Sequence, residues 1–332
     1  MPDPRPLMAL STAYWESQTF LTANRLNLFG LLAEDPLDAA TVAERLSLDS
    51  TAARLFLNAL VGLDLLVRDG EAYANGPAAA AFLVPGTPHY LGNAFRYADG
   101  LYAPWADLEK TLASGDPAVP PADYLTDADP ARTHAFVMGM HGRALGIGTA
   151  LVGLLDLTGR QRLLDVGGGP GTYSALLCGR HPELTATVLD LPAVCAVAEG
   201  IVAGMGMAER VAFAPGSYLD GLGLPDGQDV VLISGVFHRE TPTTCNDLIR
   251  RAADALEPGG LLAVADVFTD PGGATPAFAA LFGLNMRLTA PDGQVHADAD
   301  VARWMADAGF GQVDTRPFPP PMPHRLVTGV KP

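Results

Sequence analysis

The chain has 332 residues, of which 48% are hydrophobic and 17% are charged, and this is enough apolar material for about two folded domains. Its 37 acidic and 21 basic residues give a net charge of −16, which disfavours nucleic acids and anionic membranes as partners because both are negatively charged. The three cysteines show no CxxC spacing, so neither a metal site nor a disulfide framework is expected.

The first ten residues contain three prolines and an aspartate where a signal peptide would need a basic start and an apolar core. Uninterrupted apolar stretches, such as residues 261–264, are far shorter than a membrane span. We therefore expect a cytoplasmic protein.

The N-terminal part of the chain has a helical pattern. Apolar residues recur at helical spacing over 7–32 with few charges between them, which is typical of a packed or dimerising helix. Two shorter helices are predicted over 37–46 and 51–60, and segment 65–73 predicts a β-hairpin that turns at an Asp-Gly pair. Helix, turn, helix and hairpin outline a winged helix. We predict that residues 1–100 form a helical, winged-helix-like dimerisation domain.

A winged helix can also bind DNA, so its charge has to be considered. Between Leu37 and Gly76 there are three basic and six acidic residues, a balance of −3. That is the wrong sign for a helix that must approach phosphates. A dimerisation scaffold is therefore favoured, and a winged-helix DNA-binding regulator is the weaker alternative.

The remainder of the chain, residues 101–332, is predicted to form one domain of the α/β class. It begins with a helical connector over 101–158, interrupted by a loop at 115–130 that is rich in proline and aspartate. Beyond this connector, helical segments alternate with short apolar runs at 162–166, 185–190, 211–214, 229–234 and 261–266. Such alternation is typical of a parallel, doubly wound, Rossmann-like sheet.

A glycine-rich loop, Leu164-Asp165-Val166-Gly167-Gly168-Gly169-Pro170-Gly171, stands where the first of these strands ends and a helix begins. It matches neither the dinucleotide fingerprint GxGxxG nor a P-loop. Asp165 suits a cationic amino group better than a pyrophosphate, and Asp190, at the end of the next strand, can accept both hydroxyls of a ribose. An amino acid joined to a nucleoside without phosphate describes S-adenosylmethionine. The alternative interpretation is a structural turn with a capping acid.

The loop, the Leu189-Asp190-Leu191-Pro192 motif and segment 256–262 together resemble the class I methyltransferases of the plant-type and bacterial small-molecule O-methyltransferase family, which includes caffeic acid and acetylserotonin O-methyltransferases. The N-terminal part is similar to that family's dimerisation domain, so the resemblance covers nearly the whole chain. It implies a homodimeric, S-adenosylmethionine-dependent enzyme that methylates a small-molecule acceptor, most simply on oxygen.

The resemblance also implies which residues contact the cofactor. They come from the glycine loop and the ends of the following strands: Asp165, Gly167, Gly169, Asp190, Leu191, Ser217, Tyr218 and Ser234. Ser217-Tyr218 stands where the family usually has an aspartate and then an aromatic residue beside the adenine. A serine hydroxyl can still make one hydrogen bond there.

The catalytic residues follow from two strand ends. His238 lies just beyond the fourth strand, where the family has its base, although Arg239-Glu240 follows it in place of the usual Asp-Trp. Asp266 ends the neighbouring strand and can orient the imidazole of His238. Val295 stands where the family has a second acid.

The resemblance assigns acceptor contacts to two helices: Met140, His141, Phe282, Asn285 and Met286. The alternative for His141 is a capping or packing role, and for the apolar residues it is ordinary core packing. Because Val295 and the Arg239-Glu240 pair depart from the family's pattern, a C-, N- or S-methyltransferase of the same fold, or a relative that no longer methylates, stays an alternative.

Overall fold

A computed structural model describes residues 2–87, 89–119, 129–221 and 223–332. The chain divides into two compact units, Met1–Tyr102 and Ala103–Pro332. The predicted loop at 115–130 lies largely outside the described residues.

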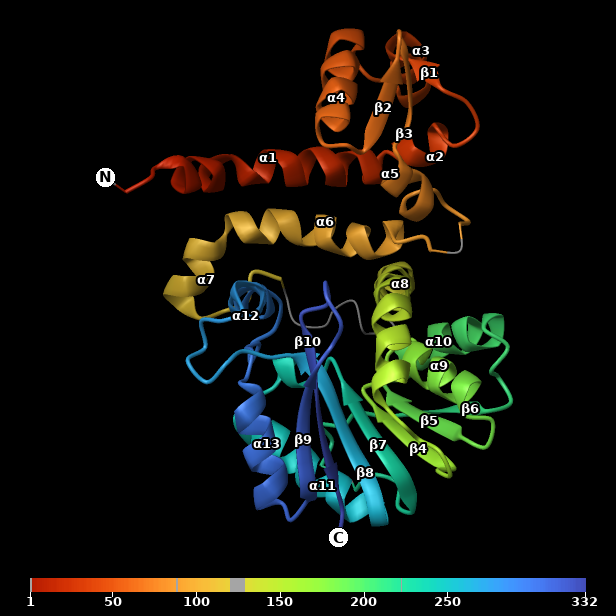
Figure 1. The fold of residues 1–332 in the computed structure, drawn as a ribbon, viewed down its shortest axis with the longest axis vertical. Helices are drawn as coiled ribbons and strands as arrows, with labels where there is room; N and C mark the ends of the chain where they lie inside the picture. The colour runs from red at the N-terminus through yellow and green to blue at the C-terminus, as the bar shows by residue number, and fades with distance from the viewer. Residues whose placement is uncertain (1, 88, 120–128, 222) are drawn as a thin grey trace. The chain divides into compact units, whose positions relative to one another are not determined.

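The first unit combines helices with a small antiparallel sheet of strand order β1-β3-β2. Its elements, shown in Figure 1, are α1 (Arg5–Arg25), α2 (Leu28–Leu31), β1 (Leu37–Asp38), α3 (Ala39–Leu46), α4 (Ser50–Gly62), β2 (Leu66–Asp69), β3 (Ala72–Asn75), α5 (Pro77–Phe82) and most of α6 (Gly92–Ala106). The starts of α3 and α4 are capped by aspartates, because Asp38 accepts the N–H of Thr41 at 2.7 Å and Asp49 accepts that of Ala52 at 2.9 Å.

Two details of this unit differ from the prediction. The helix expected over 7–32 is broken between α1 and α2, where Asn27 adopts a left-handed backbone conformation with φ 54°. The hairpin turns at Gly70-Glu71, one residue later than expected, because Asp69 still pairs with Ala72 and Gly70 supplies the positive φ that a two-residue turn needs.

One face of α1 has no cover within its own unit. Leu21 is buried, and Leu28 and Leu32 beyond α1 belong to the unit's core. The side chains nearer the N-terminus are exposed, and we call them the α1 apolar face: Leu7, Met8, Leu10, Tyr14 and Trp15, between 54% and 73% exposed.

The second unit is built on a seven-stranded sheet with the order β6-β5-β4-β7-β8-β10-β9. Its elements are α7 (Leu108–Ser114), α8 (Pro130–Leu154), β4 (Arg162–Val166), α9 (Thr172–Arg180), β5 (Thr185–Asp190), α10 (Pro192–Gly204), β6 (Val211–Pro215), β7 (Gln228–Ser234), η2 (Phe237–Arg239), α11 (Pro242–Ala255), β8 (Leu256–Val267), α12 (Ala277–Thr289), α13 (Asp298–Asp307), β9 (Gly311–Pro317) and β10 (His324–Val330). Strands β4 to β8 pair in parallel, and β10 runs antiparallel to both β8 and β9.

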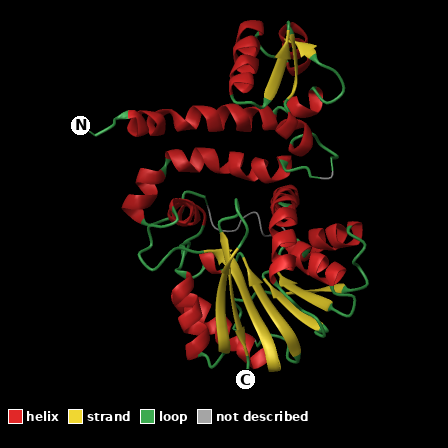
Figure 2. Ribbon diagram, viewed as in Figure 1, coloured by secondary structure: helices red, strands yellow, loops and turns green. Residues whose placement is uncertain are grey.

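Helices cover both faces of this sheet, so the predicted α/β, doubly wound architecture is confirmed (Figure 2). One core, with Leu151 of α8 and Leu177 of α9, packs against alternate residues of the central strands. The other core, with Leu248 of α11 and Trp304 of α13, packs against the remaining residues. The layers leave the strand ends free to present polar side chains.

Two features were not anticipated. Strands β9 and β10 carry no long apolar run and flank a proline-rich segment, so the sequence pattern concealed them. Helix α8 is long and apolar enough to cross a membrane by length and composition alone. Its buried positions, which include Val137, Ala144 and Leu151, pack against α9 and α10 as in the core helix of a globular domain.

Candidate active site

The predicted site residues gather at the carboxyl edge of the sheet. Neighbouring strands β4, β7 and β8 end together there, since Val166 pairs with Ile233 and Ser234 pairs with Ala265. Ligands bind at this edge in open α/β sheets.

The glycine loop after β4 has a conformation that requires glycine. Gly167 and Gly169 have φ of 67° and 54°, in the left-handed region. A Cβ on Gly167 would lie 2.7 Å from Val236 Cγ2, and one on Gly168 would lie 2.6 Å from Asp165 Cγ. A Cβ on Gly169 would meet nothing within 4 Å. The loop is therefore tightly packed beneath and open at Gly169, as a cradle for a ligand must be.

Asp165 lies directly under this loop and is fully buried. Its Oδ2 accepts the Ser174 hydroxyl at 2.7 Å, whereas its Oδ1 has no hydrogen-bond partner in the described part of the chain. Burial raises the pKa of Asp165 to about 7, and the Ser174 hydrogen bond only partly opposes this. A buried acceptor without a partner, beside an open cradle, fits the cationic amino acid end of S-adenosylmethionine.

Asp190, the last residue of β5, hydrogen-bonds the glycine loop that follows β4. Its Oδ2 accepts the Gly169 N–H at 2.7 Å and its Oδ1 accepts the Leu191 N–H at 2.7 Å. Burial raises the pKa of this carboxyl, opposed by these two backbone hydrogen bonds. Each oxygen keeps a lone pair for a further donor, so the residue fits the two ribose hydroxyls.

Ser217 and Tyr218 follow β6. The Ser217 hydroxyl accepts the N–H of Leu219 at 3.1 Å within its own turn. The ring of Tyr218 lies against the glycine loop, 3.3 Å from where a Cβ on Gly167 would be, and its hydroxyl donates to Glu240 Oε1 at 2.9 Å. Their contact with an adenine stays a prediction.

His238 and Asp266 form a close pair. His238 lies in the short helix η2 after β7, and its Nδ1 is 2.7 Å from Asp266 Oδ1, while its backbone N–H donates to Asp266 Oδ2 at 3.3 Å. Asp266 is 2% exposed. Burial by itself would raise the pKa of Asp266, but the charge and hydrogen bond of His238 and the Val267 N–H outweigh it, so the pKa lies below its ordinary value.

An ionised Asp266 can only accept a hydrogen bond, so Nδ1 of His238 carries the proton between them, and in the neutral form of the ring Nε2 presents a lone pair. Within the described residues, nothing hydrogen-bonds this Nε2. The arrangement is that of an oriented base.

Helix α12 supplies an aromatic wall beside the pair. The Phe282 ring packs edge-on against the His238 ring with 5.1 Å between centroids, and Phe278 stacks on Phe282 at 6.1 Å. Asn285 Oδ1 accepts the indole N–H of Trp105 at 2.9 Å. Met286 is almost fully buried, at 3% exposure.

The two predicted contacts on α8 lie near the glycine loop. His141 Nδ1 is 2.8 Å from the Thr172 hydroxyl, at the start of α9, and burial lowers the pKa of His141. Met140 is half-buried. Whether these residues, or those of α12, contact an acceptor stays a prediction.

Sequence reasoning missed three polar side chains around this edge. Tyr173 of α9 hydrogen-bonds Ser234 at the end of β7. Glu240 accepts a hydrogen bond from the Tyr218 hydroxyl. His324 begins β10 opposite Val267, and burial lowers its pKa to about 4, although the charge of Asp266 raises it. No motif marks Tyr173 or His324, because helix packing and sheet register bring them to the site, whereas Glu240 stands in the Arg239-Glu240 pair and its closeness to His238 in the sequence was an available signal.

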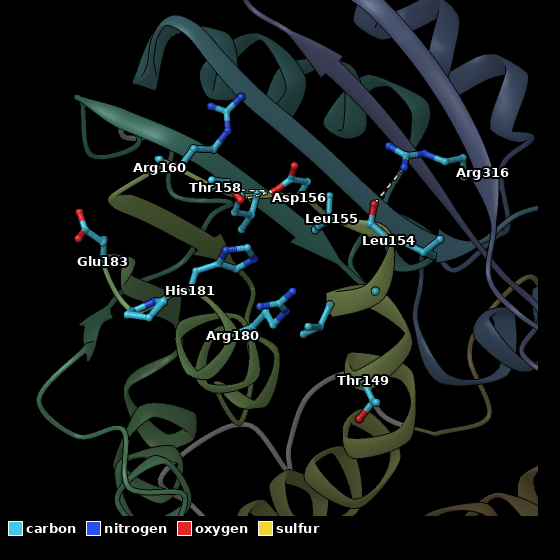
Figure 3. Close-up of a pocket in the computed structure, with 15 residues that line it drawn as sticks. Thr149, Leu154, Leu155, Asp156, Thr158, Arg160, Arg180, His181, Glu183 and Arg316 are labelled. Carbon is cyan, nitrogen blue, oxygen red and sulfur yellow. Dashed lines mark hydrogen bonds between the residues drawn. The ribbon is translucent and has the colours of Figure 1, made fainter.

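A cavity of about 820 Å³ lies elsewhere, at the amino end of β4 (Figure 3). Two of its arginines make bonds within the fold: Arg160 donates to Asp229 O at 2.6 Å and Arg316 donates to Leu154 O at 3.0 Å. None of the predicted site residues lines this cavity. Within the described residues there is also no cluster of His, Cys, Asp and Glu suited to a metal ion.

Comparison with known proteins identifies the family. The family model of an O-methyltransferase domain matches residues 118–311, and that of an O-methyltransferase dimerisation domain matches residues 8–85. The chain belongs to this O-methyltransferase family. Membership confirms the S-adenosylmethionine-dependent methyltransferase that the sequence predicted.

Similarity to individual relatives extends over nearly the whole chain. The 3-hydroxy-5-methyl-1-naphthoate 3-O-methyltransferase of Streptomyces sahachiroi is 33% identical, covering 99% of this chain and 95% of that protein. The N,N-dimethyltransferase OxyT of Streptomyces rimosus is 32% identical, covering 99% of this chain and 96% of that protein. A crystal structure of human N-acetylserotonin methyltransferase in complex with SAM has a TM-score of 0.87 at 24% identity, covering 98% of this chain and 97% of that chain, and shares the fold.

Proposed function

We propose that this methyltransferase transfers a methyl group to the hydroxyl of a small aromatic acceptor, with His238 as general base. The observation that carries the proposal is the His238–Asp266 pair, 2.7 Å apart, at the sheet edge that also holds the glycine loop.

The chain's part in the reaction is to hold the cofactor and remove a proton. Asp190 and the Gly167–Gly169 backbone would hold the nucleoside end of the cofactor, and Asp165 would interact with its amino acid end. When bound, S-adenosylmethionine supplies a methyl group already activated on a sulfonium. His238 Nε2 takes the proton of the acceptor hydroxyl, and Asp266 stabilises the imidazolium that forms.

An aromatic acceptor is favoured by the wall beside the base. Phe282 and Phe278 present stacked rings next to His238, and a planar acceptor packs well against such faces. The relative from Streptomyces sahachiroi is named for methylation of a hydroxynaphthoate, which supports the same class.

Methylation of nitrogen is the second candidate. Val295 leaves His238 without the second acid that the family resemblance implies, and the relative OxyT is named an N,N-dimethyltransferase. A neutral amine is nucleophilic before it loses a proton, so it needs less help from a base than a hydroxyl does.

A homodimer is also part of the proposal. The match to a dimerisation domain and the exposed α1 apolar face both support it, because an isolated apolar row of this size is unfavourable in water.

The test of the base is His238→Gln, which keeps a polar side chain of similar reach but cannot take up a proton at neutral pH. Turnover of a phenolic acceptor should fall by about 10²- to 10⁴-fold while the Kd for S-adenosylmethionine is unchanged. The exposed His134 on α8 gives a matched control, since His134→Gln should leave both quantities unchanged.

Two results would contradict the proposal. Near-native turnover of phenols by His238→Gln would show that His238 is not the general base. Efficient methylation of aryl amines, with none of phenols, would favour the second candidate.

A further inference from the structure

The loop 292–297 between α12 and α13 is the segment in which the family resemblance implies a second acid. Val295 stands at that position, and its Cγ2 lies 3.7 Å from where a Cβ on Gly283 of α12 would be. It therefore packs against α12. The next residue, His296, hydrogen-bonds the turn that carries His238.

His296 is 7% exposed and bonds two carbonyls of the turn that carries His238. Its Nε2 lies 3.1 Å from Phe237 O and 3.0 Å from Glu240 O. Carbonyl oxygens only accept hydrogen bonds, so Nε2 of His296 must carry the proton and donate it to both. Its ring also packs edge-on against Trp304, with centroids 5.3 Å apart.

A second residue of the loop, Gln294, hydrogen-bonds the same turn. The Gln294 backbone N–H donates to His238 O at 3.0 Å. Together Gln294 and His296 bond the carbonyls of three residues, namely Phe237, His238 and Glu240. The backbone around the imidazole is thereby held by bonds additional to those that Asp266 makes.

The backbone of His296 also reaches the strand that carries Asp266. Its carbonyl accepts the N–H of Thr269 at 3.0 Å, three residues beyond Asp266. One residue therefore bonds both the turn that holds His238 and the segment that extends β8. Its side chain fixes the first and its main chain fixes the second.

We propose that His296 is a positioning residue for the His238–Asp266 pair. It acts by bonding the backbone of the turn. The family resemblance instead implies an acid at the neighbouring position, Val295, that acts through its side chain. The proposal rests on the proposed function insofar as His238 is the base. A shift of about 1 Å in a positioned group can cost 10²-fold in rate, so a fixed turn matters for catalysis.

The test compares His296→Gln with His296→Asn. A glutamine Nε2 can occupy nearly the position of the histidine Nε2 and donate to the same carbonyls, whereas the asparagine amide is one methylene too short to reach them. Both variants are polar and differ by that methylene. His296→Leu is the third variant, used in place of asparagine if His296→Asn is unfolded at the assay temperature.

The first readout does not depend on turnover. The Nδ1 proton of His238, held between the ring and Asp266, should give a downfield proton NMR signal that His238→Gln abolishes. This signal should persist in His296→Gln and weaken or disappear in His296→Asn. Because it reports the geometry of the pair, it tests the positioning role even if His238 is not the base.

The second readout is kinetic. In His296→Asn, kcat should fall by about tenfold or more while the Kd for S-adenosylmethionine is unchanged. His296→Gln should restore kcat.

The proposal is overturned if His296→Asn and His296→Leu keep the NMR signal and native kcat. It is also overturned if kcat, cofactor affinity and melting temperature fall together and glutamine rescues none of them, which is the result of a purely structural role. A lost signal with unchanged kcat would support the positioning role and contradict the base role of His238.

Discussion

At the scale of single residues, Asp165 makes the stability of the folded protein depend on pH. Burial raises its pKa to about 7 in the folded protein, whereas in the unfolded chain it titrates near the ordinary value of 3.8. Between these values the folded protein binds a proton that the unfolded chain has released. Stability therefore falls as the pH rises through this window, and the loss is complete above the folded pKa.

The measurement is urea unfolding of the cofactor-free protein and of Asp165→Asn, which cannot titrate but can still accept the Ser174 hydroxyl. Between about pH 5.5 and about pH 8, Asp165 should remove about 2 kcal/mol of stability that Asp165→Asn retains. Other acids titrate equally in both proteins and cancel in the difference. Parallel pH profiles for the two proteins would contradict the raised pKa.

Asp190 should contribute to cofactor affinity in two ways, through the ribose and through the Gly169 N–H that it accepts. Loss of a hydrogen bond to a charged group costs about 1.5–3 kcal/mol, so Asp190→Ala should raise the Kd for S-adenosylmethionine by about tenfold or more. Calorimetry measures this, with the exposed Glu183 as control in Glu183→Ala. Unchanged affinity in a folded Asp190→Ala protein would show that Asp190 does not bind the cofactor.

The sequence predicted those site residues that sit at the end of a strand with a recognisable neighbour pattern. Asp165, Asp190 and His238 are of this kind, because the carboxyl edge of a parallel sheet collects strand ends. His324 could not be predicted, since its position depends on the register of β10 with β8, and for Glu240 the sequence shows the place beside His238 but not the hydrogen bond from the Tyr218 hydroxyl. The bonds made by His296 arise from loop geometry, which no local pattern encodes.

At the scale of secondary structure, α8 and α9 approach closely at one glycine. A Cβ on Gly148 would lie 2.6 Å from Leu176 Cδ1 and 2.8 Å from Tyr173 Cδ1, while one on Gly146 would meet nothing within 4 Å. The Leu176 side chain can move, whereas the hydroxyl of Tyr173 hydrogen-bonds Ser234, which restrains its ring.

We therefore expect opposite effects from two identical substitutions on one helix. Gly148→Ala should destabilise the protein by about 1–3 kcal/mol through overpacking. Gly146→Ala should stabilise it by up to about 1 kcal/mol, because alanine has the higher helix propensity. Denaturant unfolding measures both, and equal effects of the two substitutions would contradict the close approach.

Element boundaries were predicted only to within one or two residues even where a capping residue or a glycine marks them, since the helix expected from residue 37 begins at Ala39 after Asp38 and the hairpin turns one residue later than expected, at Gly70-Glu71. They were missed where tertiary contacts decide. The break at Asn27 follows from a left-handed residue inside an otherwise continuous apolar pattern. Strand β9 is almost entirely exposed, so it lacks the apolar alternation by which a strand is recognised.

At the scale of the whole molecule, assembly should depend on the α1 apolar face. A double variant with Leu10→Glu and Trp15→Glu places two charges where a partner would bury apolar side chains, and burial of unpaired charge is costly. It should elute as a monomer in size-exclusion chromatography with light scattering. Leu55→Glu, equally exposed but on α4, should keep the native assembly. A double variant that remains dimeric would show that the α1 apolar face is not the dimer interface.

Strand β10 lies between β8 and β9 in the sheet, although β9 precedes it in the chain. Among the described strands, β9 pairs with β10 alone, so β9 has no place in the sheet until β10 has docked on β8. Strand β10 covers the outer edge of β8, the strand that bears Asp266, and we expect it to dock after the parallel strands that precede it in the chain have paired. Strands β4 to β6, which carry the proposed cofactor cradle, pair with one another and do not require β10 for that pairing. Along one refolding time course, binding of S-adenosylmethionine should therefore return before turnover does, and the enzyme should pass through a state that holds its methyl donor but cannot yet use it.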